Sequence, residues 1–387
     1  MRTHADYRPL PLWRDAVAAI AVCCLAMLSQ PLWAAPAGHE HPPGSSEAQA
    51  ERGGPRVTAF ISVDATAADA NEDPPRLHDD VRATADLLLT WQRGGFRSLA
   101  ELVVATDETE LERLQLGWEM APNTLLWIGR FHQPASYFGY LYHHGQIAQT
   151  AISKPQVDDW EDEGGLVPQH LQGVLLDTSW TTVRGQRFDL SVGAGIAPAL
   201  TDGELEPRHL FEGSDHASRP AYALRATWYP DALRDPSLSV VFMHAEIGNE
   251  TGGAVLPASV SHLDQDAVGV FADYPVGRWR VTGGGYRIRV RADASAAIPA
   301  ESFWSGYLQV DYEWRPAWRW FGRVEGTQHA DQSRFLRVFD SVVRSRSMVG
   351  LRWDLSPRQA LTVEAARTST VAVAGNEVRV QWSAVAR

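Results

Sequence analysis

Apolar and polar residues alternate along most of the chain from Arg56 onward, in segments bounded by Gly, Pro, Asn or Asp. Clear examples are residues 114–120, 186–197 and 304–314, where every second residue is apolar. A period of two is typical of a β-strand with one apolar face, and no amphipathic helix of convincing length interrupts the pattern. The sixteen segments expected to be strands are 56–65, 82–92, 96–105, 111–120, 124–132, 169–180, 186–197, 220–229, 237–247, 266–274, 278–290, 304–314, 318–327, 346–355, 359–367 and 377–386.

The connections between these segments alternate in length. Those after even-numbered segments are short, as at 93–95, 121–123 and 356–358, whereas those after odd-numbered segments are mostly long. The longest runs from Gln133 to Pro168. Short turns at one rim and long loops at the other favour an all-β fold: a transmembrane antiparallel β-barrel of about 16 strands, with short periplasmic turns and long extracellular loops. The mean hydropathy of −0.24 is compatible with this fold, because alternating strands average out in any hydropathy window.

Tryptophans gather where the segments meet the short turns. Indole prefers the headgroup level of a membrane, so this distribution indicates a girdle facing lipid at the periplasmic rim. Tryptophans of a soluble core have no reason to gather at one end of each hairpin. The residues concerned are Trp91, Trp118, Trp127, Trp180, Trp228, Trp279, Trp314, Trp318, Trp320 and Trp353.

The first 34 residues resemble a secretory signal. Arg2, Arg8 and Arg14 precede an apolar run at 16–28, and small residues follow near Ala35. We therefore expect a signal peptide at 1–34, a disordered lead-in at 35–55 and the barrel at 56–387. The apolar run is too short for a transmembrane helix.

Charge and cysteine content limit the classes of partner. The formal net charge is −12, which makes nucleic acid an unsuitable partner. Both cysteines, Cys23 and Cys24, lie in the expected signal peptide. The mature chain therefore has no disulfide and no thiol chemistry.

The segment from Trp279 to Val290 reverses its alternation. Apolar residues and arginines exchange parity after Gly283-Gly284-Gly285. A β-bulge at the glycines would keep all the arginines on one face. Arginine facing lipid costs about 2–4 kcal/mol at the bilayer midplane, so we expect this face to line the lumen.

The chain resembles the sixteen-stranded porins of Gram-negative bacteria. Residues 129–134 (Gly-Arg-Phe-His-Gln-Pro) are similar to the glycine-arginine stretch before the constriction loop of phosphate-selective porin-like proteins. The resemblance implies that the loop at 133–168 folds into the lumen and sets the pore size. It does not carry phosphate specificity, because Lys154 is the only lysine, and the chain also lacks the usual terminal aromatic residue.

The inward positions predict a basic wall that faces an acidic loop. Such an arrangement would place a transverse field across the constriction and slightly favour small anions. The alternative is that the acidic residues form a solvated loop tip and the arginines pair with Asp311, Glu313 and Glu325. The expected pore-lining residues are Arg130, Arg280, Arg287, Arg289, Arg319, Arg323, Arg352 and Arg379. Those expected in the constriction loop are Tyr137, Tyr140, Asp158, Asp159, Glu161, Asp162 and Glu163.

Other chemical motifs are weak. His143-His144 and His39-Glu40-His41 lack the ligand spacing of known zinc sites, and we expect no metal and no cofactor. Ser214-Asp215-His216 are neighbours in the chain and therefore cannot align as a catalytic triad.

The sequence therefore predicts a porin in a bacterial outer membrane that lets small hydrophilic solutes diffuse passively. It would contact lipid and lipopolysaccharide, and both a monomer and a homotrimer fit the pattern. An outer-membrane enzyme with a hydrolytic site at the loop rim, and a non-conducting adhesin or scaffold, are the alternative functions.

Overall fold

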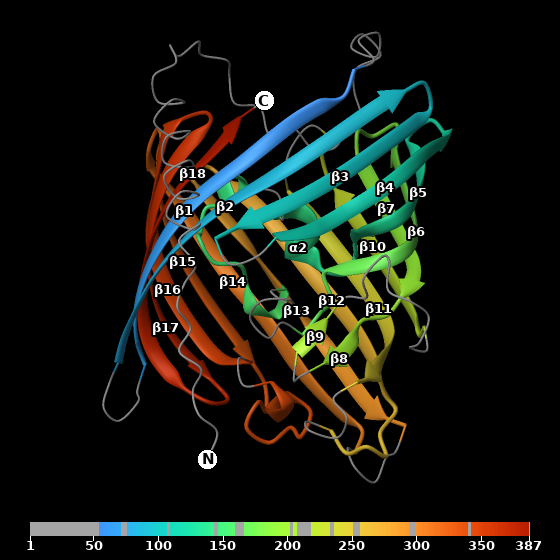
Figure 1. Ribbon diagram of the computed structural model, residues 1–387. Coiled ribbons are helices and arrows are strands. Elements are labelled where there is room, and N and C mark those ends of the chain that lie inside the picture. Colours follow the sequence, from blue (N-terminus) through green and yellow to red (C-terminus); the bar gives the residue numbers. More distant parts are fainter. Residues whose placement is uncertain are drawn as a thin grey trace.

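One closed sheet forms the body of the protein (Figure 1). The computed structural model describes residues 54–70, 76–106, 109–142, 146–158, 166–201, 204–206, 218–232, 236–250, 256–293, 299–339 and 342–386. The expected signal peptide and most of the lead-in lie outside these residues. The sheet has eighteen strands, of which β8 (Ala199–Thr201) and β9 (Glu204–Glu206) belong to a loop. The other sixteen pair with their neighbours, and β1 pairs with β18 to close the barrel.

All sixteen expected strands are present, and all neighbouring pairs in the ring are antiparallel. This confirms the predicted fold class. The strands are β1 (Arg56–Ala70), β2 (Arg76–Arg93), β3 (Phe96–Ala105), β4 (Thr109–Ala121), β5 (Thr124–His132), β6 (His170–Thr181), β7 (Arg187–Ile196), β10 (Pro220–Tyr229), β11 (Ser237–Asn249), β12 (His262–Val276), β13 (Trp279–Ala292), β14 (Glu301–Arg315), β15 (Trp318–Thr327), β16 (Val343–Ser356), β17 (Gln359–Thr370) and β18 (Ala374–Ala386).

The two rims differ as predicted. Connections at 94–95, 122–123, 277–278, 316–317 and 357–358 are tight turns. Asn123, Ala317, Gly94 and Gly277 adopt positive φ there, which two-residue hairpin turns require. The opposite rim carries the long connections between β5 and β6, β7 and β10, and β15 and β16. The connections at 106–108 and 371–373, on that same rim, are short.

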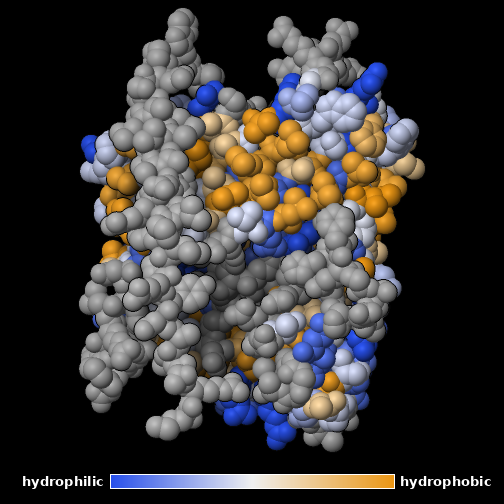
Figure 2. Space-filling model, in the orientation of Figure 1, coloured by the Kyte–Doolittle hydropathy of each residue, from blue (hydrophilic) through white to orange (hydrophobic). Residues whose placement is uncertain are grey.

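Side chains alternate between the two faces of the wall. In β4, Leu114, Leu116 and Trp118 are exposed on the outside, while Gln115 and Gly117 are buried. Figure 2 shows apolar side chains gathered on the outer surface over β3 and β4. An apolar outer band of this kind is what contact with lipid requires. Among the described residues, no helix is long and apolar enough to cross a membrane.

Most of the tryptophans expected in the girdle point outward near the short turns. Trp118, Trp279 and Trp314 are about half exposed, and Trp318 stacks on Trp353 with ring centroids 5.0 Å apart. Trp127 differs, because it is partly buried against the interior apolar cluster. Trp304, 54% exposed, lies toward the long-loop end of β14 and belongs to the opposite edge of the apolar band.

The expected bulge in β13 is absent. Its pairing with β12 and β14 runs without a register shift through Gly283-Gly284-Gly285. The parity of the side chains therefore continues, so that Tyr286, Ile288 and Val290 are buried inside and Arg287 and Arg289 are exposed outside. The prediction of a bulge was wrong because the apolar residues beyond the glycines pack against a loop in the lumen, not against lipid.

Candidate pore constriction

The β5–β6 loop (residues 133–169) starts beyond a row of three glycines. Gly129 pairs with Gly173 across β5 and β6, and Gly173 pairs with Gly195 across β6 and β7. A Cβ at any of the three would lie 2.0–2.3 Å from a backbone oxygen of the neighbouring strand, and Gly129 has a φ of +133°. Only glycine tolerates such a close approach. Beyond this row the alternation of exposure ends, and Phe131 and His132 are both buried.

The first part of the loop forms a short helix, α2 (Tyr137–Tyr142), inside the barrel (Figure 1). The Tyr137 ring stacks on Phe271 of β12, with centroids 4.5 Å apart and planes 9° apart. The Phe138 ring meets Tyr307 of β14 edge-on at 6.2 Å. These aromatic contacts attach α2 to the inner face of β12–β14.

The buried carboxylate of Asp158 connects a later part of the β5–β6 loop to the residues around the start of α2. Asp158, which has no exposed surface, accepts hydrogen bonds from the Ser136 hydroxyl (3.2 Å) and the Phe138 amide (3.4 Å). The Tyr286 hydroxyl lies 2.7 Å from the same carboxylate and also accepts a hydrogen bond from the Tyr137 amide at 2.9 Å. Asp158 belongs to the acidic run for which the sequence left open an arginine wall or a solvated loop tip, and these contacts join it to the loop and to β13.

Two further tyrosines of α2 reach acidic residues of the wall. The Tyr140 hydroxyl donates to Asp177 at 3.1 Å, and the Arg225 guanidinium lies 3.5 Å from the centroid of the Tyr140 ring. The Tyr142 hydroxyl donates to Asp273 at 3.2 Å. Burial raises the pKa of Tyr140 to about 12, and that of Tyr137 likewise to about 12. Both tyrosines therefore stay neutral at physiological pH.

The second part of the loop reaches β15–β17 on another part of the wall. Arg323 donates to the carbonyl oxygens of Ser153 and Lys154, each at 2.9 Å. Arg352 donates to the Ile147 carbonyl at 2.8 Å. In the opposite direction, the Ile152 amide donates to Glu364 at 2.9 Å. The loop thus bonds to the wall through its backbone.

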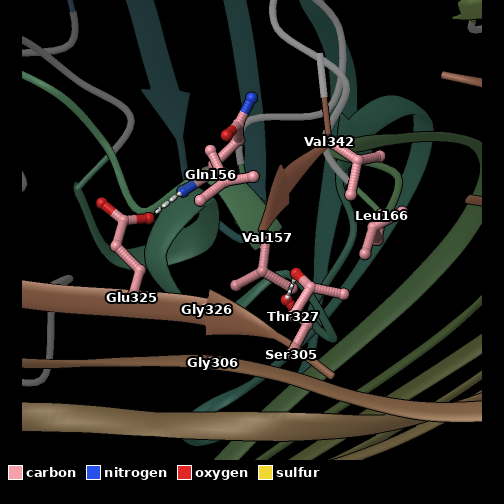
Figure 3. A pocket seen from close by; sticks show the side chains of 10 residues that line it. Gln156, Val157, Leu166, Ser305, Gly306, Glu325, Gly326, Thr327 and Val342 are labelled. Carbon is pink, nitrogen blue, oxygen red and sulfur yellow. Dashed lines mark hydrogen bonds between the residues drawn. The ribbon is translucent and has the colours of Figure 1, made fainter. Parts of the chain in front are cut away.

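A small pocket lies where the loop meets β14–β16, and Figure 3 shows its lining. Gln156 and Val157 come from the loop, and the Gln156 amide donates to Glu325 of β15 at 2.8 Å. Ser305 and Thr327 share a hydrogen bond of 2.9 Å across β14 and β15. The pocket is an imperfection in the packing of loop against wall, and nothing about it indicates a ligand.

The arginines predicted to line the pore fall into three groups. The side chains of Arg280, Arg319 and Arg379 face the lumen and keep 25–35% of their surface exposed. Arg323 and Arg352 also face inward, and Arg130 is buried beyond the glycine row, but all three are nearly inaccessible. Arg287 and Arg289 lie on the outside, on the same face as Trp279.

The inward arginines have acidic neighbours, as one of the two sequence interpretations expected. Arg280 pairs with Asp273 at 2.5 Å, Arg323 with Glu325 at 3.0 Å, and Arg379 with Glu377 at 3.0 Å. Glu325 is one of the three acidic partners named from the sequence, and the other two, Asp311 and Glu313, lie opposite Arg280 and Arg319 in the strand register. Asp159, Glu161, Asp162 and Glu163 lie outside the described residues, as do His143-His144, His39-Glu40-His41 and Ser214-Asp215-His216.

Several residues that hold the loop were not identified from the sequence. Glu364, Tyr286 and Gln265 all bond to it from the wall. Their inward parity was readable from the alternation in their strands. Their role was not, because it depends on the path of the loop across the lumen.

The chain matches no protein family, and no curated protein matches its sequence. Its structure is similar to those of many solved proteins, among them three from outer membranes. OmpT of Vibrio cholerae has a TM-score of 0.55 and 8% identity, over 86% of this chain and 98% of that chain. The outer membrane channel DcaP of Acinetobacter baumannii has a TM-score of 0.54 and 13% identity, over 86% and 97%. OmpF of Salmonella typhi, solved with daunomycin, has a TM-score of 0.54 and 9% identity, over 85% and 97%.

These likenesses concern the fold, and they agree with the closed ring of sixteen strands. The protein therefore has the closed β-barrel fold of these outer-membrane proteins. Its architecture is similar to that of the sixteen-stranded porins.

Proposed function

We propose that the barrel is a porin through which small hydrophilic solutes diffuse passively, with the β5–β6 loop as its constriction. The observation that carries this proposal is the attachment of the loop to two parts of the inner wall. α2 packs on β12–β14, and residues 147–156 bond to β15–β17. A loop held across a lumen narrows the path through the barrel.

The wall beside the loop supplies the polar surface that such a path needs. Arg319 and Asp354 lie 3.5 Å apart with side chains 35% and 22% exposed, and Arg379 and Glu377 form a similar pair. Because each cation has an anion beside it, the selectivity of the channel is weak. The channel keeps the slight preference for small anions that the sequence predicts, because exposed guanidinium groups bind carboxylate and phosphate oxygens in two-point contacts.

Reconstitution in planar lipid bilayers tests this function. The purified barrel should produce stepwise increases in current, and liposomes that contain it should swell in small sugars more rapidly than in large ones. Replacing residues 147–156 by a glycine-serine linker should raise single-channel conductance, because material leaves the narrowest section. If heat-modifiability on gels shows that the barrel is folded but it carries no current, the result would instead support the enzyme, adhesin or scaffold alternatives.

The assembly and the membrane partners follow from the same proposal. A homotrimer is the proposed assembly, since Vibrio cholerae OmpT has been solved in a trimer form. Native mass spectrometry in detergent would show three chains per particle, and a single chain would contradict it. The exposed Arg287 lies opposite Trp304 at the long-loop edge of the apolar band, and Arg289 lies one pair further out, where the phosphates of lipopolysaccharide are expected.

A further inference from the structure

Three side chains at the base of the β5–β6 loop lie in one row across neighbouring strands. His132, the last residue of β5, pairs with His170, the first residue of β6. On the other side of β5, Leu114 of β4 pairs with Arg130. Continuing this register by two residues places Glu112 opposite His132. The loop therefore leaves and re-enters the wall between two histidines with a glutamate beside them.

The polar atoms of these three residues converge. One ligand atom from each of Glu112, His132 and His170 lies within 4.8 Å of the others. A Glu112 carboxylate oxygen is 2.9 Å from Nε2 of His170, and the two imidazole centroids are 4.8 Å apart. All three residues are buried, with 8%, 3% and 3% of their surface exposed.

Charged groups surround the row. The buried Glu101 of β3 has a carboxylate oxygen 4.0 Å from Nε2 of His132 and accepts a hydrogen bond from Arg113. Arg130 donates to Glu110. Glu112 itself faces His170 directly.

Two imidazoles and one carboxylate form the donor set of three-ligand zinc sites, which keep a fourth position for water. Ca²⁺ and Mg²⁺ prefer oxygen ligands, so the histidines favour a transition metal. A Zn²⁺ ion about 2 Å from each donor needs donors about 3–4 Å apart, which small side-chain rotations would give here. The Glu101 carboxylate, 4.0 Å from Nε2 of His132, adds negative charge beside the row.

We propose that Glu112, His132 and His170 bind a divalent transition-metal ion of the Zn²⁺ type, which ties together the two ends of the β5–β6 loop. The ion would close the base of a loop of more than thirty residues. A cross-link of this kind restricts the loop because closing a long flexible segment is otherwise entropically costly. The site does not depend on the channel function, since binding is measured without any current.

The test is metal titration of the full mature barrel in detergent, purified without a polyhistidine tag and stripped by a chelator. We expect one equivalent of Zn²⁺ per chain by calorimetry, and a visible d–d absorption band of low-coordinate geometry with Co²⁺. Affinity should fall as the pH drops through about 6.5, because protons compete for the imidazoles. Glu112→Gln, His132→Ala and His170→Ala should each weaken Zn²⁺ binding more than about tenfold.

Matched controls come from other histidines of the same chain. His244 pairs with Asp266 at 2.8 Å on the outer surface, so His244→Ala removes a histidine–carboxylate pair without touching the row. This variant and the double variant His143→Ala/His144→Ala should bind Zn²⁺ as the native chain does. The nearly isosteric Glu112→Gln is the variant that best preserves the fold, and heat-modifiability on gels checks it.

Three results would overturn the proposal. They are the absence of Zn²⁺ binding at micromolar concentrations by the native chain, unchanged binding by folded Glu112→Gln, and loss of binding in the control variants. If the native chain conducts but binds no Zn²⁺, the metal site fails and the channel stands. If it binds Zn²⁺ but carries no current, the metal site stands and the proposed channel function fails.

Discussion

The inner wall of the barrel consists of two regions with different chemistry. On β11–β13 most of the inward side chains are apolar and almost inaccessible, as with Val241, Met243, Phe271 and Ile288, although Asp273 and Arg280 form an ion pair there. On β15–β18 the corresponding positions carry charged and polar groups such as Arg323, which is equally inaccessible. Other buried charged and polar residues on the inner face of β15–β18 are Arg346, Arg352, Glu364 and Gln381.

Both regions are covered by the same loop, yet they hold it by different interactions. α2 is held by ring packing and by a few buried hydrogen bonds, in the way that a protein core is held. Residues 147–156 are held by charge-assisted hydrogen bonds from arginines and glutamates to the loop backbone. The comparison shows that a barrel interior can be a protein core on one side and a charge network on the other.

Removal of a buried arginine from the charged region should have the largest effect. Arg323→Ala removes the arginine 3.0 Å from the buried Glu325, which keeps only the more distant Arg346 at 3.9 Å among the ion pairs of the described residues, and it removes this donor from two loop carbonyls. Breaking a buried pair costs about 3–5 kcal/mol. Urea unfolding in micelles should show this loss, together with noisier single-channel currents.

Arg319→Ala is the matched control on the same strand and the same face. Its side chain is 35% exposed and lies 3.5 Å from Asp354. A pair so accessible contributes about 0–1 kcal/mol. Equal losses of stability in the two variants would contradict the distinction between buried arginines that hold the loop and exposed arginines that line the pore.

The apolar region should respond more weakly to the loss of a single polar atom. Tyr286→Phe removes the hydroxyl that contacts Asp158 at 2.7 Å and accepts from the Tyr137 amide. Leaving such groups unsatisfied costs about 1–3 kcal/mol. Tyr307→Phe serves as the control, because the Tyr307 hydroxyl is buried and has no hydrogen-bond partner among the described residues. Thermal unfolding should show that Tyr286→Phe is considerably less stable than Tyr307→Phe. The reverse order would show that the Tyr286 hydroxyl does not help to hold the loop.

The smallest effect concerns ion selectivity. Arg379→Ala removes a partly exposed positive charge from the lumen and leaves its partner Glu377 in place. The reversal potential across a salt gradient should shift toward cations, while conductance changes little, because nearby charges dominate within a Debye length of about 8 Å. Arg289→Ala, on the outside of β13, should leave the reversal potential unchanged. A shift in Arg289→Ala alone would contradict the assignment of faces.

The sequence alone determined the sixteen strands of the ring, the difference between the two rims, and most strand boundaries within four residues, while the end of β1 and the start of β2 were missed by five and six residues. These features are local, since alternation with a period of two and the turn residues between segments can be read in any short window. Residues 111–120 and 304–314 show the alternation, and the structure contains β4 and β14 there.

Only the tertiary structure decided what the inward residues contact. The arginines after Gly283-Gly284-Gly285 were expected in the lumen because arginine is costly on a face that contacts lipid. In the barrel, Tyr286 and Ile288 instead pack inside, against the loop and its surroundings. Likewise, nothing in the sequence places Glu112 beside His170, because the two residues meet only through the register of three strands. The alternation of a strand assigns each residue to a face, but the environment of that face depends on where the rest of the chain folds.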